Sequence, residues 1–276
     1  MKINELHSIT EIKPEHCYQT RGSRPVRALC NDLNYYVCKY HTSSGFPYHL
    51  FNEYLAAYFL QIWQLPVPEF AFVKIKKEHT FQTNYPYHYF DNVCFGSRFI
   101  GEYKEVDKLF LESSILKKEN LTGRDTFLKI GLFDIWLCNE DRHFENFNLL
   151  YDLKSNTFVP IDHVFCFNSN NIETDPYLIS SNESILSSPF INRFFVRTLQ
   201  PELNKIRLRL FKDFKINVNR CHEELDNILS QIPLTWEADY SYLKTRLELL
   251  FTEEWLKSCL DYFTELFVLN IKTQKK

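Results

Sequence analysis

Residues 138–150 read Cys138-Asn-Glu-Asp-Arg-His-Phe-Glu-Asn-Phe-Asn-Leu-Leu150 and join two apolar parts of the chain. Residues 127–138, which lead into this segment, are apolar nearly all round, as a buried central helix would be. Residues 147–151 and 158–162 are short apolar runs with a polar connection between them, which predicts a β-hairpin. A loop this polar, fixed between buried elements, is costly to build and therefore indicates a function.

Upstream of this segment, short β-prone runs surround a single helix. The strands are expected at residues 26–30, 35–40, 69–74 and 92–100. Residues 52–64 predict the helix, which Pro66 and Pro68 end. After about residue 101 helices dominate, and residues 240–251 and 253–269 are amphipathic.

A strand-rich part followed by a helical part predicts an α+β fold with two lobes and a cleft between them. We expect residues 1–100 to form the small β-rich lobe and residues 101–276 the helical lobe. The whole chain of 276 residues is long enough to hold both as one domain.

Composition narrows the classes of protein. Hydrophobic residues make up 45% of the chain and charged residues 24%, which is usual for a folded soluble protein. A net charge of −3 gives no reason to expect nucleic acid or a membrane as partner. The eight cysteines form no Cys-x-x-Cys pair, and residues 1–16 lack the apolar core of a signal peptide. We therefore expect a cytoplasmic protein with reduced thiols.

The polar loop and the end of the hairpin carry the groups that phosphoryl transfer needs. Asp141 and Asn146 stand five residues apart, and Asp162 ends the second apolar run. Phosphoryl transfer requires a carboxylate that orients the attacking hydroxyl and oxygen ligands that hold Mg²⁺. Asp141 suits the first role, and Asn146 with Asp162 suits the second. The spacing Asp-x-x-x-x-Asn is that of a kinase catalytic loop.

Two residues of the first lobe complete this set. Lys39 lies near the end of a predicted strand, and Glu53 opens the predicted helix on its apolar stripe. A carboxylate on an apolar stripe needs a cation, because an unpaired buried charge costs several kcal/mol. A strand lysine paired with a helix glutamate is the arrangement that kinases use beside the α- and β-phosphates of ATP.

These residues, taken in order, resemble those of the HipA-like serine/threonine kinases. The resemblance covers roughly residues 20–190, and it extends more distantly to phosphoinositide kinases. It is carried by Arg21-Gly-Ser-Arg-Pro-Val26, Val37-Cys-Lys39, Asn52-Glu-Tyr-Leu55, Leu65-Pro-Val-Pro-Glu69, Phe95-Gly-Ser-Arg-Phe-Ile100, Asn139-Glu-Asp-Arg-His-Phe-Glu-Asn146 and Ile161-Asp-His-Val-Phe-Cys-Phe167. It implies a bilobal protein-kinase-like fold and an enzyme that uses ATP and Mg²⁺.

The resemblance also implies a role for each matching residue. Asp141 would be the catalytic base, with His143 where many protein kinases carry a lysine. Asn146 and Asp162 would bind the metal, and Lys39 with its partner Glu53 would contact the phosphates. Phe99 and Ile100 would lie beside the adenine, and Gly22 and Ser23 in the loop over the phosphates. In some relatives a serine of that loop is autophosphorylated, which makes Ser23 a candidate.

The partners implied are a protein substrate and a cognate regulator or antitoxin. The sequence departs from the family pattern at three places. The phosphate-covering loop has Gly22 alone, and His163-Val164 follows Asp162. The chain also starts close to the kinase core, so we expect no extra N-terminal subdomain and no antitoxin contact through one.

Three other functions remain open. Asp-Arg-His-x-x-Asn also occurs in lipid kinases, so a phosphoinositide or small-molecule kinase is one alternative. Residues 168–182 carry two acids and no Lys or Arg, which argues against a phosphorylated head group. Asp141, His143, Asp162 and His163 could form a two-metal phosphohydrolase site, although we expect His163 to be a neutral structural histidine. The third alternative is a pseudokinase that serves as an interaction module.

Overall fold

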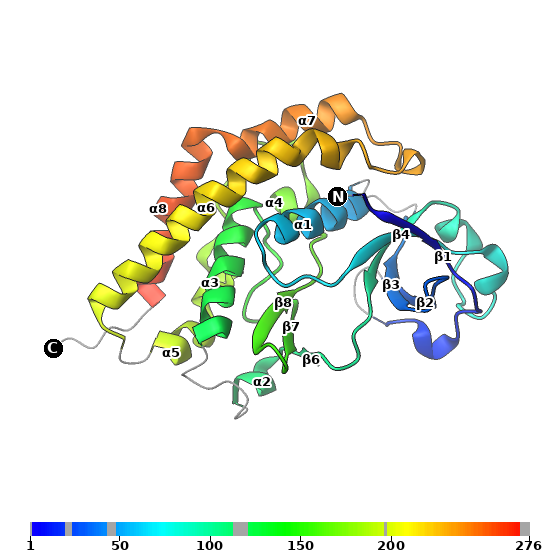
Figure 1. Cartoon of the computed structure of the whole chain (residues 1–276), viewed down its shortest axis with the longest axis horizontal. Helices are drawn as coiled ribbons and strands as arrows, with labels where there is room; N and C mark the ends of the chain where they lie inside the picture. Colours follow the sequence, from blue (N-terminus) through cyan, green and yellow to red (C-terminus); the bar gives the residue numbers. More distant parts are fainter. Residues whose placement is uncertain (1, 20–23, 43–47, 113–120, 196–197, 271–276) are drawn as a thin grey trace.

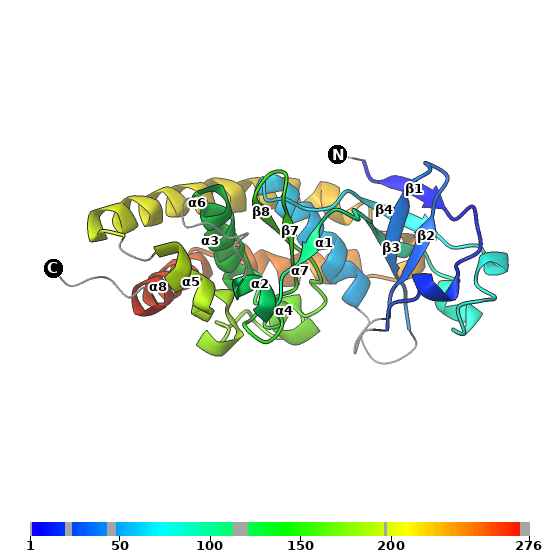
Figure 2. The ribbon, with the colours of Figure 1, turned by 90° about the horizontal axis from the view of Figure 1, so that it is seen from below.

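The structure is a computed structural model that describes residues 2–19, 24–42, 48–112, 121–195 and 198–270. It has the expected α+β architecture, with a small β-sheet lobe and a larger helical lobe (Figure 1). In the view turned by 90°, the sheet lies at one end of an elongated molecule and α3, α5, α6 and α8 lie toward the other (Figure 2). The boundary at residue 100 stays a prediction.

The first lobe is built on a five-stranded sheet in the order β1-β4-β5-β3-β2. Its strands are β1 (Asn4–His7), β2 (Val26–Leu29), β3 (Tyr35–Lys39), β4 (Phe70–Lys74) and β5 (Cys94–Arg98). All neighbours are antiparallel except β1, which runs parallel to β4 with Asn4 opposite Ala71. β1 was not predicted, because Leu6 is its one apolar residue and its four residues show no apolar alternation.

The two faces of this sheet have different environments. Val26, Cys38, Val73 and Cys94 point to one face and form a small core of their own. Their sequence neighbours on the strands, such as Val37 and Lys39, point to the other face, toward the second lobe. The period-two alternation of a strand therefore places Lys39 on the cleft side.

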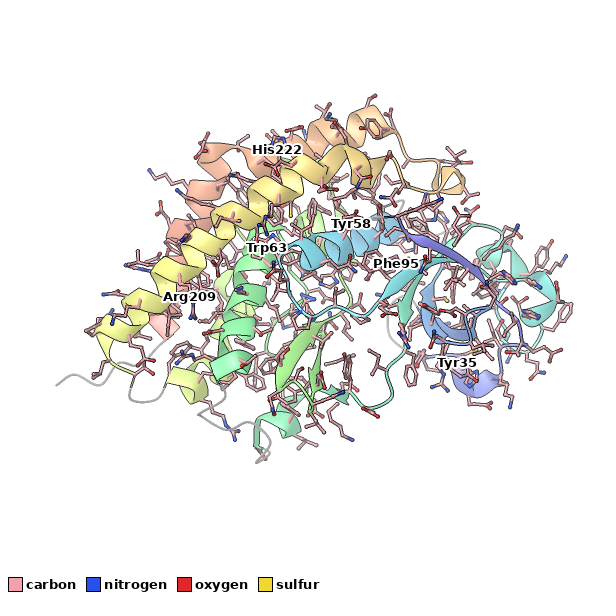
Figure 3. All side chains as sticks on the ribbon, in the orientation of Figure 1. Tyr35, Tyr58, Trp63, Phe95, Arg209 and His222 are labelled. Carbon is pink, nitrogen blue, oxygen red and sulfur yellow. The ribbon has the colours of Figure 1, made fainter. Side chains whose placement is uncertain are left out.

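Helix α1 (His49–Ile62) connects the two lobes. It begins three residues earlier than predicted, and twelve of its residues are buried. It packs against β5, α4 and α6, so it is enclosed on nearly every side. Trp63, labelled in Figure 3, follows its C-terminal end. The Trp63 ring stacks on Trp136 with ring centroids 5.5 Å apart. A helix enclosed in this way has no polar stripe, and its apolar run is explained by burial on all faces.

The helical lobe surrounds α3 (Leu121–Trp136), which packs on β8 and α8. A three-stranded sheet, β6 (Lys104–Glu105), β7 (Leu149–Asp152) and β8 (Thr157–Pro160), contains the predicted hairpin. The remaining helices are α2 (Lys108–Glu112), α4 (Cys166–Asn170), α5 (Pro189–Phe195), α6 (Gln200–Leu229), α7 (Tyr240–Glu248) and α8 (Glu253–Asn270). Among the described helices, none combines the length and apolar character that a membrane crossing requires.

The helical lobe also reaches back to the sheet behind α1. The Tyr54 hydroxyl of α1 donates to the Ile228 carbonyl of α6 at 2.7 Å. Beyond α6, the Trp236 indole N–H donates to the Val93 carbonyl at 2.7 Å, and the Trp236 ring packs edge-on against Phe72. These contacts fix α1 between the lobes.

Candidate active site

A cleft of about 890 Å³ lies between the lobes. Its upper wall comes from β3 and β5, and its lower wall comes from the loop after α3 and from the hairpin. Lys39, Glu53, Asn146 and Asp162 all contribute to its lining. Residues that are more than 100 positions apart in the sequence therefore meet in one cavity.

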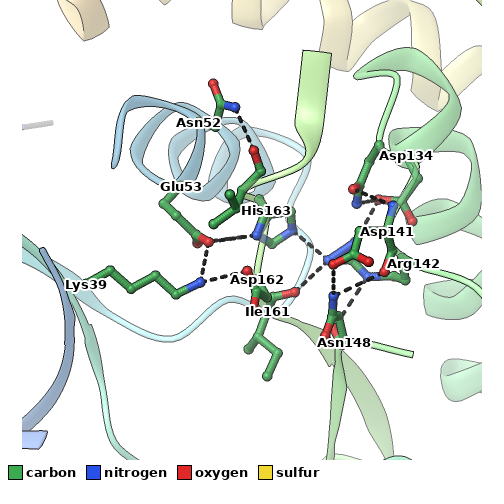
Figure 4. Close-up of polar contacts among 12 residues, drawn as sticks. Lys39, Asn52, Glu53, Asp134, Asp141, Arg142, Asn148, Ile161, Asp162 and His163 are labelled. Carbon is green, nitrogen blue, oxygen red and sulfur yellow. Dashed lines mark hydrogen bonds and ion pairs between the residues drawn. The ribbon is translucent and has the colours of Figure 1, made fainter. Parts of the chain in front are cut away.

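Lys39 forms ion pairs with two carboxylates. Its ammonium contacts Glu53 Oε1, and it lies 2.8 Å from Asp162 Oδ1 (Figure 4). Burial raises the pKa of Glu53 to about 7, and Lys39 opposes that shift. Asp162 is only partly buried. Burial raises its pKa, but the ion pair with Lys39, together with Glu53 and Arg142, holds that pKa below the usual value. The predicted Lys39–Glu53 contact is therefore present, and Asp162 joins it.

Asp141 is held by two amides. Asn146 Nδ2 donates to Asp141 Oδ1 at 2.9 Å, and Asn148 Nδ2 donates to Asp141 Oδ2 at 3.0 Å. Burial raises the pKa of Asp141, and the bond from Asn146 partly opposes this. Because the Asn146 nitrogen is turned to Asp141, its amide oxygen is directed elsewhere, as a metal ligand requires.

A buried ion pair supports this loop from behind. Arg142 is fully buried, and its Nη1 lies 2.7 Å from Oδ1 of Asp134 on α3. Arg142 Nη2 donates to the Ile161 carbonyl at 2.8 Å, just before Asp162, and contacts His163 Nε2 at 3.0 Å (Figure 4). One side chain thus joins α3, the polar loop and the end of the hairpin. Removing one partner of such a pair typically costs about 3–5 kcal/mol.

His163 is a structural residue in this network, as the sequence suggested. Burial and then the Arg142 charge hold its pKa well below the usual value. A neutral ring with Nε2 as acceptor fits the contact with Arg142. Its backbone N–H donates to Glu53 Oε1 at 2.9 Å, so His163 also fixes the carboxylate that pairs with Lys39.

Asp162 lies two residues beyond the end of β8, not at the strand terminus that the sequence predicted. Its φ of 57° is in the left-handed region, which is uncommon for a residue other than glycine. The next segment is held by Asn52 of α1, whose Nδ2 donates to the Val164 carbonyl and to Asn170 Oδ1, both at 2.8 Å. Such backbone strain is typical of functional sites that the surrounding contacts define.

Among the other predicted site residues, those that the structure describes lie in the cleft or in the polar loop. Phe99 and Ile100 line the cleft just after β5, but the Phe99 N–H donates to the Tyr35 carbonyl at 2.8 Å. His143 forms a tight turn with Asn146, and its Nδ1 accepts from the Glu145 N–H at 3.2 Å. Gly22 and Ser23 lie outside the described residues.

Three residues of the site have a detectable signal in the sequence but were not predicted to belong to it. Asp134 is an acid inside an apolar helix, which predicts a buried cation such as Arg142. Asn52 is a fully buried amide in α1, and Asn148 interrupts the apolar run of residues 147–151. A buried polar side chain needs a partner, so each could have been proposed as part of a network.

The metal ligands predicted from sequence have suitable chemistry. Lys39 contacts Oδ1 of Asp162, and the carboxylate has a second oxygen. The Asn146 amide oxygen and this carboxylate are the hard oxygen donors that Mg²⁺ prefers. Within the described ranges no group of three or more His, Cys, Asp and Glu side chains is arranged to hold a metal. Mg²⁺ often binds through one or two protein ligands together with phosphate oxygens.

Comparisons with known proteins agree with this geometry. The family model of the HipA-like kinases matches residues 15–265 of this chain. The crystal structure of CtkA, a proinflammatory kinase of Helicobacter pylori, aligns over 94% of this chain and 99% of that chain, with a TM-score of 0.57 and 16% sequence identity. This likeness shows that the bilobal fold is that of a kinase. A search of the curated proteins found no match. Because the family model spans most of its residues, the chain belongs to the HipA-like kinase family and is a phosphotransferase.

Proposed function

We propose that this chain uses Mg²⁺ and transfers the γ-phosphoryl group of ATP to a Ser or Thr hydroxyl of a protein. The observation that supports this is the meeting of Lys39 and Glu53 from the first lobe with Asn146 and Asp162 from the second. The cleft of about 890 Å³ has room for a nucleotide, since ligand pockets usually measure about 300–1,000 Å³.

Lys39 is the residue of the first lobe that would bind the phosphates. Its ammonium is buried between two carboxylates, so its charge and position are fixed before a ligand arrives. The adenine would lie near the end of β5. Because the Phe99 N–H is already bonded to Tyr35, we assign the base contact to Ile100 and the adjoining Gly101.

Asn146 and Asp162 would hold Mg²⁺ through the amide oxygen and a carboxylate oxygen. The bound ion would neutralise charge on the phosphates. The protein fixes both ligands beforehand: Asn146 through its bond to Asp141, and Asp162 through its ion pair with Lys39. Such fixed polar groups need no reorganisation during the reaction.

Asp141 would orient the acceptor hydroxyl and accept its proton. Two amide donors fix the orientation of the carboxylate, and burial raises its pKa, which makes it a better proton acceptor. His143, two residues further, would take the position that a lysine has in many protein kinases.

A protein hydroxyl fits the acceptor side better than a phosphoinositide. The segment after Asp162 carries Glu173 and Asp175 but no Lys or Arg between residues 168 and 182, and these acids would repel a phosphorylated head group. A hydrolase with His163 as metal ligand has less support, because His163 Nε2 faces Arg142. A regulator or antitoxin as partner and a cytoplasmic location stay predictions.

Asp141→Asn provides the test. We expect the purified wild-type protein to move label from γ-labelled ATP to Ser or Thr of a peptide library or of proteins in a cell extract. Loss of a general base typically costs about 10²–10⁴ in rate, so Asp141→Asn should lose transfer to that extent. Binding of ATP by calorimetry should change little. Full transfer by Asp141→Asn, or label found in lipid alone, would contradict the proposal.

A further inference from the structure

Asn148 has no role in the predicted site, yet it contacts Asp141, the proposed catalytic base. Its Nδ2 donates to Asp141 Oδ2 at 3.0 Å and to the Asp141 carbonyl at 3.1 Å. Asn146 makes the mirror contacts, with Asp141 Oδ1 at 2.9 Å and with the same carbonyl at 3.2 Å. Each carboxylate oxygen of Asp141 thus has its own amide donor.

The backbone of Asn148 is fixed independently of these bonds. Its φ of 44° lies in the left-handed region. Its carbonyl accepts from the Ile161 N–H at 3.0 Å and from Arg142 Nε at 3.4 Å. The hairpin and the buried arginine therefore point the amide at Asp141, as Figure 4 shows.

The backbone conformation alone does not explain why residue 148 is an asparagine. Asn tolerates a positive φ better than most residues, but Gly tolerates it at least as well. If Asn148 only stabilised the local turn, its bond to the Asp141 backbone carbonyl would be enough. The second bond reaches the carboxylate that the proposed mechanism uses, seven residues away in the chain.

Two donors restrict the carboxylate in a way that one cannot. The terminal torsion of an Asp side chain is broad, so a carboxylate with a single bond can still rotate about it. In the proposed function the Asn146 amide oxygen also binds the metal. Asn146 is therefore not free to orient Asp141 alone. Asn148 lies beside the cleft but has no part in the predicted metal site.

We propose that Asn148 is a positioning residue, whose amide fixes the orientation of the Asp141 carboxylate toward the acceptor hydroxyl. This inference rests on the proposed function. Correct orientation of reacting groups contributes a large part of enzymatic rate, and small misplacements are costly. The effect of Asn148 should therefore appear in the rate of transfer and not in binding of the nucleotide or the metal.

Asn148→Gly removes the amide and keeps the positive φ. A hydrogen bond to a charged group contributes about 1.5–3 kcal/mol, so we expect kcat to fall about 10- to 150-fold. The KM for ATP and the Mg²⁺ concentration for half-maximal rate should stay within about twofold of wild type, because the binding groups are intact. Asn146→Gly should instead raise that Mg²⁺ concentration at least about tenfold.

Two further variants separate positioning from folding. Asn148→Asp keeps the shape but replaces a donor by a second carboxylate, so it should lose at least as much kcat as Asn148→Gly. Asn156→Gly makes the same exchange at another positive φ, 56°, in the turn between β7 and β8, and should leave kcat unchanged. Thermal unfolding checks that all variants are folded.

The outcomes distinguish this inference from the proposed function. If the wild-type protein binds ATP but transfers no phosphate to any acceptor, the proposed function fails and this inference with it. If the wild type transfers phosphate and both Asn148 variants keep its kcat, the inference alone is overturned. A rise in the KM for ATP or in the Mg²⁺ requirement that matches the loss of kcat would also overturn it, because Asn148 would then serve binding.

Discussion

At the scale of single residues, Lys39 is the cation that pairs with two carboxylates of the cleft. The side chains of Lys39 and Glu53 are only 11% and 5% exposed, so water screens their interaction little. Asp162 is more exposed, and it approaches the same ammonium from the other lobe. The three residues therefore form a structural unit even without a nucleotide.

Replacing Lys39 should lower the free energy of unfolding, and the loss should depend on Glu53. Lys39→Met leaves Glu53 buried without its cation, and we expect the free energy of unfolding to fall by about 3 kcal/mol. Adding Glu53→Gln removes the unpaired charge and should restore part of the loss. Urea unfolding of the two single variants and the double variant measures the coupling. A Lys39→Met protein as stable as wild type would refute the description of this unit.

His163 should make the protein less stable in acid. Only the unfolded chain takes up a proton on this ring near pH 6.5, because in the folded state burial and Arg142 hold the His163 pKa well below that value. Its contribution to the free energy of unfolding is complete above pH 6.5. It is lost as pH falls, by about 1.4 kcal/mol between pH 7.5 and 5.5.

His163→Gln isolates this contribution. The raised pKa of Glu53 acts with the opposite sign over the same range, but wild type and variant share it. The change in unfolding free energy between pH 7.5 and 5.5, measured in urea, should therefore differ between them by about 1.4 kcal/mol. An equal pH dependence, or a His163 ring that titrates near pH 6.5 by NMR, would show that the ring is not held neutral.

At the scale of elements, α3 is the helix against which the second lobe packs. Gly131 of α3 faces Leu186, and a Cβ at this position would lie 2.5 Å from Leu186 Cδ2 and 2.6 Å from its Cγ. Leu186 is fully buried, so it has little room to move. The glycine therefore permits the close approach of the segment after Asp162.

Gly131→Ala sets two effects against each other. Alanine in a helix gains about 1 kcal/mol over glycine, whereas overpacking a core costs about 1–3 kcal/mol. With two contacts under 3.0 Å, we expect overpacking to win and the protein to lose about 1 kcal/mol or more of stability.

Gly101→Ala, in a turn outside the helices, is the control for the steric effect, because its added Cβ would meet only Phe99 at ordinary contact distances. Chemical denaturation of both variants makes the comparison. A Gly131→Ala protein more stable than wild type would mean that Leu186 and its segment can move aside at little cost in stability.

The sequence predicted the regular elements well where their pattern is simple. Strands β2 to β5 of the first lobe, the hairpin and α8 lie within a few residues of their expected places. The parallel strand β1 was missed, because backbone pairing with β4 and not side-chain pattern defines it. Helix α4 was missed too, since Phe167, Asn168 and Ser169 all have φ near +57°, which no propensity predicts for such residues.

The site was predictable as a set of residues but not as a network. Spacing and chemistry led to Lys39, Glu53, Asp141, Asn146 and Asp162, which the structure brings together. The sequence indicates that Asp134 and Asn148 need polar partners, but it does not say which ones. Those partners, Arg142 and Asp141, depend on how the loops pack in three dimensions.

At the scale of the whole molecule, the lobes share one core. The larger hydrophobic cluster includes residues of α1, β4 and β5 as well as of the helices around α3. Behind α1, the contacts of Tyr54 with Ile228 and of Trp236 with Val93 join the lobes again, on α6 and the segment after it. Packing behind α1, away from the cleft, therefore helps to set the geometry of the cleft.

A crystal structure with Mg²⁺ and a non-hydrolysable ATP analogue tests the central claim most directly. We predict the base near Ile100, the phosphates beside Lys39, and the metal bound by Asn146 and Asp162 with phosphate oxygens. The terminal phosphate should face Asp141. A nucleotide bound outside this cleft, or a metal held by residues other than Asn146 and Asp162, would contradict the account.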